Sequence, residues 1–432
     1  MDYSQVEENQ ATITTVKPTR QKEKLVLILL FTIIVAYLDR VNVSMLLADS
    51  QFLLDMGIQG RPVQMGMLMT AFLAAYGVGN LLFSPLGDII GPRKAMSLSV
   101  LLWAPAMLLG GLSASFAVLL GSRIFLGACE GMHWPMQSKY VKNWFPPEER
   151  GKANAVWLVG LMLGPTIALP FFSWLIPLSG WRDSFFILAV ISLLPIYFIW
   201  CKTRDYACQH PAVNQTELCQ IEDGLNREKE REASDQLGLW QNIRVFAVNY
   251  RFWLLTIVSF CHASMWWGTM AWLPSYLKVD RGFSWQALGA AASVPYLLGV
   301  LAVLGSGFLS DRIGRRAPFI AVSVLGAAAG IYYGLHAADN FLTVVFLSSG
   351  VVSLAVGLPS FYALLQKLVP ARAAGVGAGV MNGVTQAGAA FAPMIIGFFI
   401  SLTGTYAGGL MYLVGVGLLG FGCMAVLWVQ GH

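Results

Sequence analysis

Long apolar stretches alternate with short polar segments along almost the whole chain. Several stretches exceed the roughly 20 residues that a helix needs to cross the hydrocarbon core of a bilayer. One stretch is less apolar because it carries Arg123, Glu130 and Lys139. The pattern predicts an all-α integral membrane protein with twelve transmembrane helices, over Leu25–Leu38, Met65–Leu86, Leu98–Ala117, Val118–Tyr140, Val156–Leu178, Phe185–Trp200, Phe252–Leu277, Leu288–Leu309, Phe319–Leu335, Leu342–Leu365, Val376–Leu402 and Leu410–Val429.

Composition agrees with this pattern. Hydrophobic residues make up 56% of the chain and charged residues 12%, whereas a soluble domain carries about 25% charged residues. The first 24 residues are polar and lead directly into the first span. We therefore expect residues 1–24 to form an N-terminal tail and not a cleaved signal peptide.

Basic residues gather on one side of the expected membrane. The tail and the segments after spans two, four, six, eight and ten contain 21 lysines and arginines, whereas the opposite side holds four. The positive-inside bias then predicts a multi-pass protein with both termini in the cytoplasm. The net charge of +5 reflects this topology, so the expected partner is the lipid bilayer and no nucleic acid is expected.

Enzyme and cofactor chemistry find no support in the residues. The six cysteines lie in expected helices or on the cytoplasmic side, and they lack the spacing with histidines that a metal site needs. The sequence contains no nucleotide-binding loop of the Walker type and no Ser/His/Asp arrangement. We expect a protein that is not an enzyme and that uses neither metal nor cofactor.

The chain divides into two halves around one polar insert. A cytoplasmic central loop is expected over 204–250, between a six-helix bundle at 25–203 and a second at 251–432. The halves repeat each other at a fixed offset, because Pro135, Pro146 and Gly151 recur 224 residues later as Pro359, Pro370 and Gly375. Parallel repeats of this kind are typical of secondary transporters, which bind substrate between the halves near the midplane.

One short motif occurs in both halves, after span two at Gly87–Lys94 and after span eight at Ser310–Arg316. Glycine permits a tight turn there, and arginine can reach an opposing carboxylate or a helix C-terminus. The twin loops resemble the signature of the major facilitator superfamily, and the resemblance covers nearly the whole chain. It implies two bundles related by a pseudo-twofold axis, and it implies that these loops latch the cytoplasmic gate through Asp88, Gly91, Arg93, Asp311, Gly314 and Arg316.

Four charges lie within expected spans: Asp39 and Arg40 in the first, and Arg123 and Glu130 in the fourth. A charge at the bilayer centre costs about 2.5–3.5 kcal/mol on insertion scales, so such residues usually face a cavity or pair with one another. One interpretation is a set of salt bridges that only hold helices together. The other is a binding site, and the confinement of the charges to the first half favours it, because the second half has neutral residues at the matching positions.

The residue types indicate anion binding coupled to protons. Arginine stays protonated and forks onto carboxylate or sulfonate oxygens. A carboxylate beside it can gain or lose a proton, so a proton and a substrate anion could neutralise the cavity together.

Within the superfamily, the sequence resembles the anion:cation symporter family, which carries sugar acids and other organic anions. The resemblance rests on Tyr37–Arg40, on Arg123 with Glu130, on Trp144–Arg150 and on Trp272–Leu277. It implies that Arg40 is the main substrate ligand and that Asp39 and Glu130 are the protonatable pair. By the same resemblance, the remaining substrate-site residues are Tyr37, Tyr76, Arg123 and Asn382.

The sequence also departs from that family. After Glu130 the family often has Ala-Pro-x-Phe-Pro, whereas this sequence has Gly-Met-His-Trp-Pro over 131–135, which includes His133. Leu161 takes the place of a glutamine that contacts substrate hydroxyls in sugar-acid carriers. We therefore expect a smaller or less hydroxylated anion than a hexonate. His133 could bind or titrate, or simply pack in the bundle. Lys139 could add charge to the cavity or extend to the interface. In span seven, His262, Trp266 and Trp267 are candidates for a substrate contact.

The expected function is proton-coupled symport of a small organic anion, such as a carboxylate, sugar acid or sulfonate, into a bacterial cell. The protein would act as a monomer in the inner membrane. The alternatives are an anion antiporter or an exporter and, from a different class, a membrane sensor that does not transport.

Overall fold

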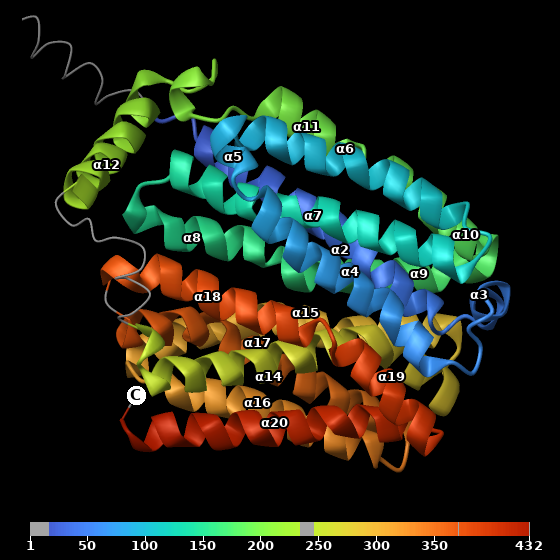
Figure 1. Ribbon diagram of the computed structural model, residues 1–432. Helices are drawn as coiled ribbons and strands as arrows, with labels where there is room; N and C mark the ends of the chain where they lie inside the picture. The colour runs from blue at the N-terminus through green and yellow to red at the C-terminus, as the bar shows by residue number, and fades with distance from the viewer. Residues whose placement is uncertain (1–16, 234–245, 370, 432) are drawn as a thin grey trace, which may run out of the picture.

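The computed structural model describes residues 17–233, 246–369 and 371–431, which are helical almost throughout and include no β-strand. Residues 1–16 of the expected tail and 234–245 of the expected central loop lie outside the described part. The helices form two bundles with their axes in one common direction (Figure 1).

The first bundle contains six spans. They are α2 (Gln21–Leu46), α4 (Pro62–Phe83), α6 (Pro92–Gly111), α7 (Phe116–Trp144), α8 (Pro147–Leu158) with α9 (Gly160–Ser179), and α10 (Trp181–Ile191) with α11 (Leu194–Lys202). Short helices join or follow them: α3 (Ser50–Asp55), α5 (Leu86–Ile89), the 3-10 turn η1 (Ala207–Gln209) and α12 (Gln215–Ala233).

The second bundle repeats the arrangement. Its spans are α14 (Tyr250–Ser275), which continues as the π-helical turn η2 (Tyr276–Asp280), α15 (Trp285–Ile313), α16 (Ala317–Leu335), α17 (Asn340–Leu368), α18 (Ala371–Ala389) with α19 (Ala392–Thr403), and α20 (Tyr406–Val429). The twelve spans predicted from hydropathy are thus present. Several are longer than predicted, because polar residues such as Asp39 and Arg40 continue a helix inside the bundle.

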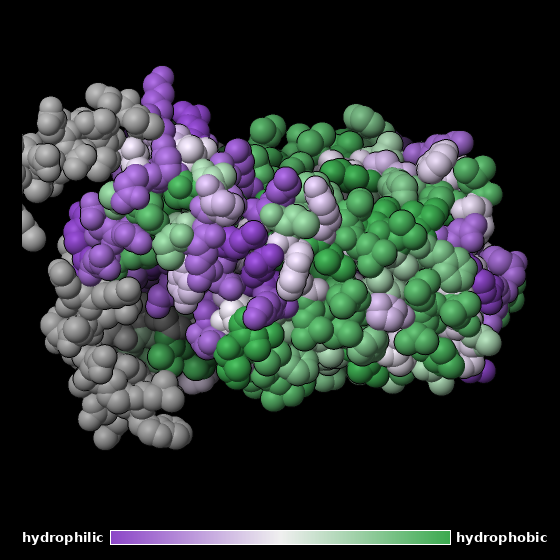
Figure 2. Space-filling view, turned by 90° about the horizontal axis from the view of Figure 1, so that it is seen from above, coloured by the Kyte–Doolittle hydropathy of each residue, from purple (hydrophilic) through white to green (hydrophobic). Residues whose placement is uncertain are grey.

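Among the described residues, ten helical spans are long and apolar enough to cross a membrane. The two others, α7 and α14, are of sufficient length, but charged residues in α7 and tryptophans with His262 in α14 lower their hydropathy. Large apolar side chains such as Leu81 and Phe308 are exposed on the outside of the bundles. Figure 2 shows this hydrophobic surface with polar residues gathered toward both ends of the molecule, as expected of a protein with its sides in lipid.

Among the described residues, the two bundles meet where α4 packs on α19 and α18, α9 on α15, and α2 on α14. At the end that carries α3, here called the α3 end, glycines bring the backbones into contact. A Cβ added to Gly66 would lie 2.3 Å from the carbonyl oxygen of Pro393, and one added to Gly397 would lie 2.3 Å from that of Pro62. This end of the interface is closed.

At the opposite end, here called the α12 end, the first part of the central loop packs on the first bundle. Glu217 of α12 is fully buried and accepts hydrogen bonds from the hydroxyl of Thr19 and the backbone N–H groups of Gln21 and Lys22, at 2.6, 3.1 and 3.0 Å. It therefore satisfies N–H groups that the first turn of α2 would otherwise leave unpaired. Further along α12, Arg150 and Glu228 form a bidentate ion pair.

Candidate substrate and proton site

An ion pair lies buried in the first bundle. Nε of Arg40 on α2 donates to Oε2 of Glu130 on α7 at 2.9 Å, and Nη2 of Arg40 lies 2.8 Å from the same oxygen. The side chains are 4% and 0% exposed. Glu130 is the fifteenth of the 29 residues of α7, so the pair lies near mid-membrane depth. A charge pair this deep is stable only because each partner compensates the other.

Aromatic rings surround the Arg40 guanidinium. Its central carbon lies 4.9 Å from the ring centroid of Tyr37, 4.8 Å from that of Tyr76 and 5.6 Å from that of Phe72. Trp267 of the second bundle approaches to 5.7 Å. Cation–π attraction favours the charged arginine in a place with little water. The site therefore surrounds a buried guanidinium with aromatic rings from both halves.

Asp39 and Arg123 complete the group of charges, called below the charge cluster (Asp39, Arg40, Arg123 and Glu130). Arg123 donates to the backbone oxygen of Asp39 at 3.4 Å and lies over the ring of Phe72 at 4.7 Å. Neither carboxylate oxygen of Asp39 has a hydrogen-bond partner among the described residues, although the side chain is fully buried. Adjacent residues of a helix point about 100° apart, so Asp39 does not share the direction in which Arg40 meets Glu130.

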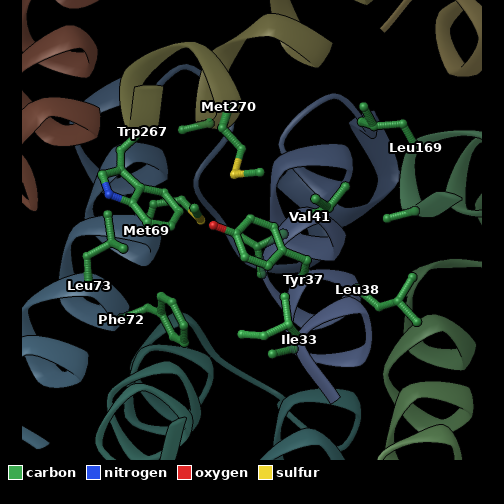
Figure 3. Packing of buried hydrophobic residues seen from close by; sticks show 14 of the residues in the cluster. Ile33, Tyr37, Leu38, Val41, Met69, Phe72, Leu73, Leu169, Trp267 and Met270 are labelled. Atoms are coloured by element: carbon green, nitrogen blue, oxygen red, sulfur yellow. The ribbon is translucent and has the colours of Figure 1, made fainter. Parts of the chain in front are cut away.

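The second bundle contributes aromatic and amide groups. Trp267 on α14 stacks on Tyr37, with ring centroids 6.5 Å apart and planes at 16°, and its indole N–H donates to Gln386 of α18 at 3.2 Å. Figure 3 shows the hydroxyl of Tyr37 directed toward the α14 residues Trp267 and Met270. Asn382 is half-buried on α18, one turn before Gln386. Tyr37, Tyr76, Arg40 and Arg123 are thus close together, whereas Asn382 is linked to them only through its helix.

Other candidates take structural or separate positions. Lys139 pairs with Asp88 at the end of α4 and α5, and so contributes no charge to the cluster. His262 lies 2.8 Å from the carbonyl oxygen of Leu354 and packs against a phenylalanine within the second bundle. Trp266 contacts Tyr296 edge to face. His133 is buried one turn from Glu130.

The two motif loops make contacts inside their own halves. Gly91 and Gly314 adopt φ of +84° and +74°, which only glycine adopts without strain. Arg93 donates to the carbonyl oxygen of Trp200 near the C-terminus of α11 and lies over the Trp200 ring. Arg316 donates to the hydroxyl of Ser310. The side chain of Asp311 lies outside the described part of the structure.

Sequence reasoning did not identify Phe72 or Gln386 as site residues. Phe72 lies four residues before Tyr76 on α4, and helical spacing of four could have placed it on the same face. Gln386 lies four residues after Asn382, so the same spacing applies. A phenylalanine and a glutamine in apolar spans carry no other signal, because their role depends on which helix lies opposite.

Comparison with known proteins shows the family of the chain. Residues 29–393 match the family model described as the Major Facilitator Superfamily. The chain is 30% identical to a protein of Cupriavidus necator named "Probable sulfoacetate transporter", over 92% of this chain and 91% of that one. It is 27% identical to a Bacillus subtilis protein named "Probable galactarate/D-glucarate transporter", over 92% and 90% of the two chains.

Solved structures show the same fold. A bacterial homolog of the human lysosomal transporter Spinster superposes with a TM-score of 0.71 at 17% identity, covering 95% of this chain and 97% of that one. The xylose transporter XylE from E. coli superposes with a TM-score of 0.72 at 14% identity, covering 94% and 97%. These matches and the twin motif loops lead to one conclusion: the chain belongs to the Major Facilitator Superfamily and is a membrane transporter of its anion:cation symporter type.

Proposed function

We propose that the protein takes up a small organic anion together with protons. The observation that carries this proposal is the buried pair of Arg40 and Glu130 beside the interface between the bundles. Among the described residues, Arg40 is the only cation that has cation–π contacts with aromatic rings of both bundles. A guanidinium binds carboxylate or sulfonate oxygens through parallel hydrogen bonds.

Competition for Arg40 would couple the anion to a proton. While Glu130 is ionised, its carboxylate occupies Arg40 and the pair is neutral. A proton on Glu130 weakens that interaction and frees the guanidinium for a substrate anion, after which the site is neutral again. A loaded carrier with a proton on Glu130 and an anion on Arg40 therefore reorients without burying an unpaired charge.

Asp39 supplies a second proton site in this proposal. An ionised carboxylate that is fully buried without a partner in the described residues is costly, so this group is suited to hold a proton. Arg123 lies at its backbone and would stabilise the ionised form when the proton leaves.

The substrate class proposed is a short carboxylate or sulfonate. Leu161 is apolar where sugar-acid carriers often have glutamine, so one side-chain partner for substrate hydroxyl groups is missing. The relative named for sulfoacetate, a two-carbon sulfonate, supports the same size. Tyr37, Tyr76 and Asn382 would contact the bound anion.

The orientation follows from charge and contact pattern. The positive-inside bias favours an orientation in which the α12 end faces the cytoplasm. The membrane proposed is a bacterial inner membrane. The α3 end is closed by backbone contacts, whereas Arg93, Asp88 and Arg316 bind partners in their own halves. The conformation is thus closed to the outside, and the motif loops would latch the cytoplasmic end in the opposite state. One chain supplies both halves of the site, so the monomer is the transport unit.

The test is uptake into proteoliposomes with radiolabelled sulfoacetate, galactarate and D-glucarate, with and without an imposed pH gradient. Symport predicts that an acidic exterior drives accumulation of at least one anion above equilibrium. Uptake that does not depend on the pH gradient would contradict proton coupling. Strict exchange without net flux would instead show an antiporter, and binding without transport would show a sensor.

A further inference from the structure

A line of buried polar side chains runs along one face of α7, away from the charge cluster. Glu130, His133, Gln137 and Tyr140 follow one another at spacings of three, four and three residues, which place them on one side of a helix. We call them the α7 polar face. Each is at most 2% exposed. Apolar residues at such positions would cost less free energy in a membrane bundle, because buried polar groups must form hydrogen bonds.

Neighbouring helices add polar groups to this face. The side-chain nitrogen of Gln137 lies 3.4 Å from Nε2 of His133, and it donates to the hydroxyl of Thr32 on α2 at 3.1 Å. The Tyr140 hydroxyl and the Thr203 hydroxyl lie 2.7 Å apart, at the end of α11. Thr203 precedes Arg204 and Asp205, which are partly exposed at the α12 end. The face therefore extends from mid-membrane to that end.

Several polar atoms along this route are incompletely satisfied. Within the part of the chain that the structure describes, Oε1 of Glu130, Oε1 of Gln137 and the indole N–H of Trp103 have no hydrogen-bond partner. Trp103 on α6 contacts the ring of His133 edge to face at 5.2 Å. Three unsatisfied groups around one histidine form the kind of polar environment in which water bridges side chains.

We propose that the α7 polar face is the route by which the coupling proton leaves Glu130 for the α12 end, with His133 as the relay. The inference rests on the proposed proton symport. The Glu130 carboxyl gives its proton through a bridging water to one imidazole nitrogen, and the imidazole releases a proton from its other nitrogen. Gln137 and, beyond it, the Tyr140–Thr203 pair would line the rest of the path to bulk water. The proton would thus travel inside the first bundle, and the anion between the bundles.

The charges around His133 are consistent with a transient cation. Glu130 lies one turn away on the same helix, Arg40 on α2 opposes a positive imidazole electrostatically, and α6 contributes the neutral Trp103. His133 would therefore carry charge only during transfer and return to the neutral form.

The experiment compares two modes of transport in proteoliposomes, using the anion identified in the uptake screen. Proton-driven uptake requires release of the proton in every cycle, whereas counterflow exchange does not, because the carrier stays loaded. His133→Gln keeps a hydrogen-bonding side chain but cannot relay, and Tyr140→Phe removes only a hydroxyl. His262→Gln is the matched control, since that histidine is buried at a backbone carbonyl in the other bundle.

We expect His133→Gln to slow proton-driven uptake at least about tenfold, equal to about 1.4 kcal/mol in the barrier, with counterflow within about twofold of wild type. Tyr140→Phe should show a smaller loss of the same kind, and His262→Gln should show neither. If uptake and counterflow fall to the same extent in both His133→Gln and Tyr140→Phe, the α7 polar face has only a structural role. Unchanged uptake in both would exclude the route, whereas wild-type uptake that ignores the pH gradient would overturn the symport proposal itself.

Discussion

Arg40 places two nitrogen atoms on a single oxygen of Glu130, and leaves the other oxygen of that carboxylate without a partner among the described residues. The pair is compact and almost inaccessible, and it joins α2 to α7 across 90 residues of sequence. A protonated or a displaced carboxylate would expose the guanidinium to an anion at the interface.

Glu130→Gln is expected to separate proton coupling from anion transport. The amide keeps a hydrogen-bond acceptor for Arg40 but cannot carry the proton, so accumulation under a pH gradient should fall to the equilibrium level while counterflow persists. The measurement is both assays on one reconstituted sample. Accumulation that survives in Glu130→Gln would move the coupling site to another residue, with Asp39→Asn as the next variant.

Arg40→Lys should reduce anion affinity at least about a hundredfold, equal to about 2.7 kcal/mol, because a lysine is a point charge and lacks the planar fork. Thermal shift of the purified protein with increasing anion measures this, since a ligand stabilises the state that binds it. Arg182→Lys is the control, as that arginine pairs with Asp55 at the surface of the α3 end. Equal shifts in wild type and Arg40→Lys would place the anion elsewhere.

Trp267→Phe should change selectivity more than rate. The smaller ring loses the hydrogen bond to Gln386 and some of the contact with Tyr37, which enlarges the site beside Arg40. We expect uptake of D-glucarate relative to sulfoacetate to rise by roughly tenfold, the low end of the range that one methylene-sized change in a pocket produces. Trp253→Phe on the exposed side of α14 is the control, and a ratio that stays constant in Trp267→Phe would contradict a specificity role.

Gly66→Ala should hinder closure of the α3 end. The new methyl group would lie 2.3 Å from the carbonyl oxygen of Pro393, so the two helices must separate. We expect slower uptake and faster labelling of Val63→Cys by an impermeant thiol reagent from outside. Gly77→Ala, on the same helix with nothing within 4 Å of the added carbon, should behave as wild type. Unaltered labelling in Gly66→Ala would show that this contact does not control the gate.

Docking of α12 should depend on pH through Glu228. The hydrogen bonds from Arg150 lower the pKa of Glu228 below its usual value, so this interaction is complete above the ordinary glutamate pKa of about 4.3 and is lost as the pH falls through the lowered value. The protection of residues 215–228 against hydrogen exchange, relative to the intrinsic rate at each pH, should fall below that pH, and Glu228→Gln should show the lowered protection at pH 7. Glu222→Gln, exposed on the same helix, should not.

The candidate site was only partly predictable. The four charges were recognisable because ionised groups in apolar spans are rare and costly, whatever surrounds them. The pairing among these charges was not recognisable, because Asp39 and Glu130 are both carboxylates and the sequence does not tell which of them contacts an arginine side chain. The rotation of α2 relative to α7 directs the Arg40 side chain to Glu130. The carboxylate of Asp39 has no hydrogen-bond partner among the described residues.

Local chemistry explains what the sequence alone determined. Hydrophobicity and charge are properties of each segment. The twelve spans, the two repeated halves and the side of the membrane that holds most basic residues could therefore be predicted from the sequence. Only the tertiary structure decided that Trp267 covers Arg40 and that Lys139 turns to Asp88. It also aligned His133, Gln137 and Tyr140 with Thr32 and Thr203. These contacts join residues far apart in the chain, and they depend on helix rotation and crossing, which close packing sets and which no single segment encodes.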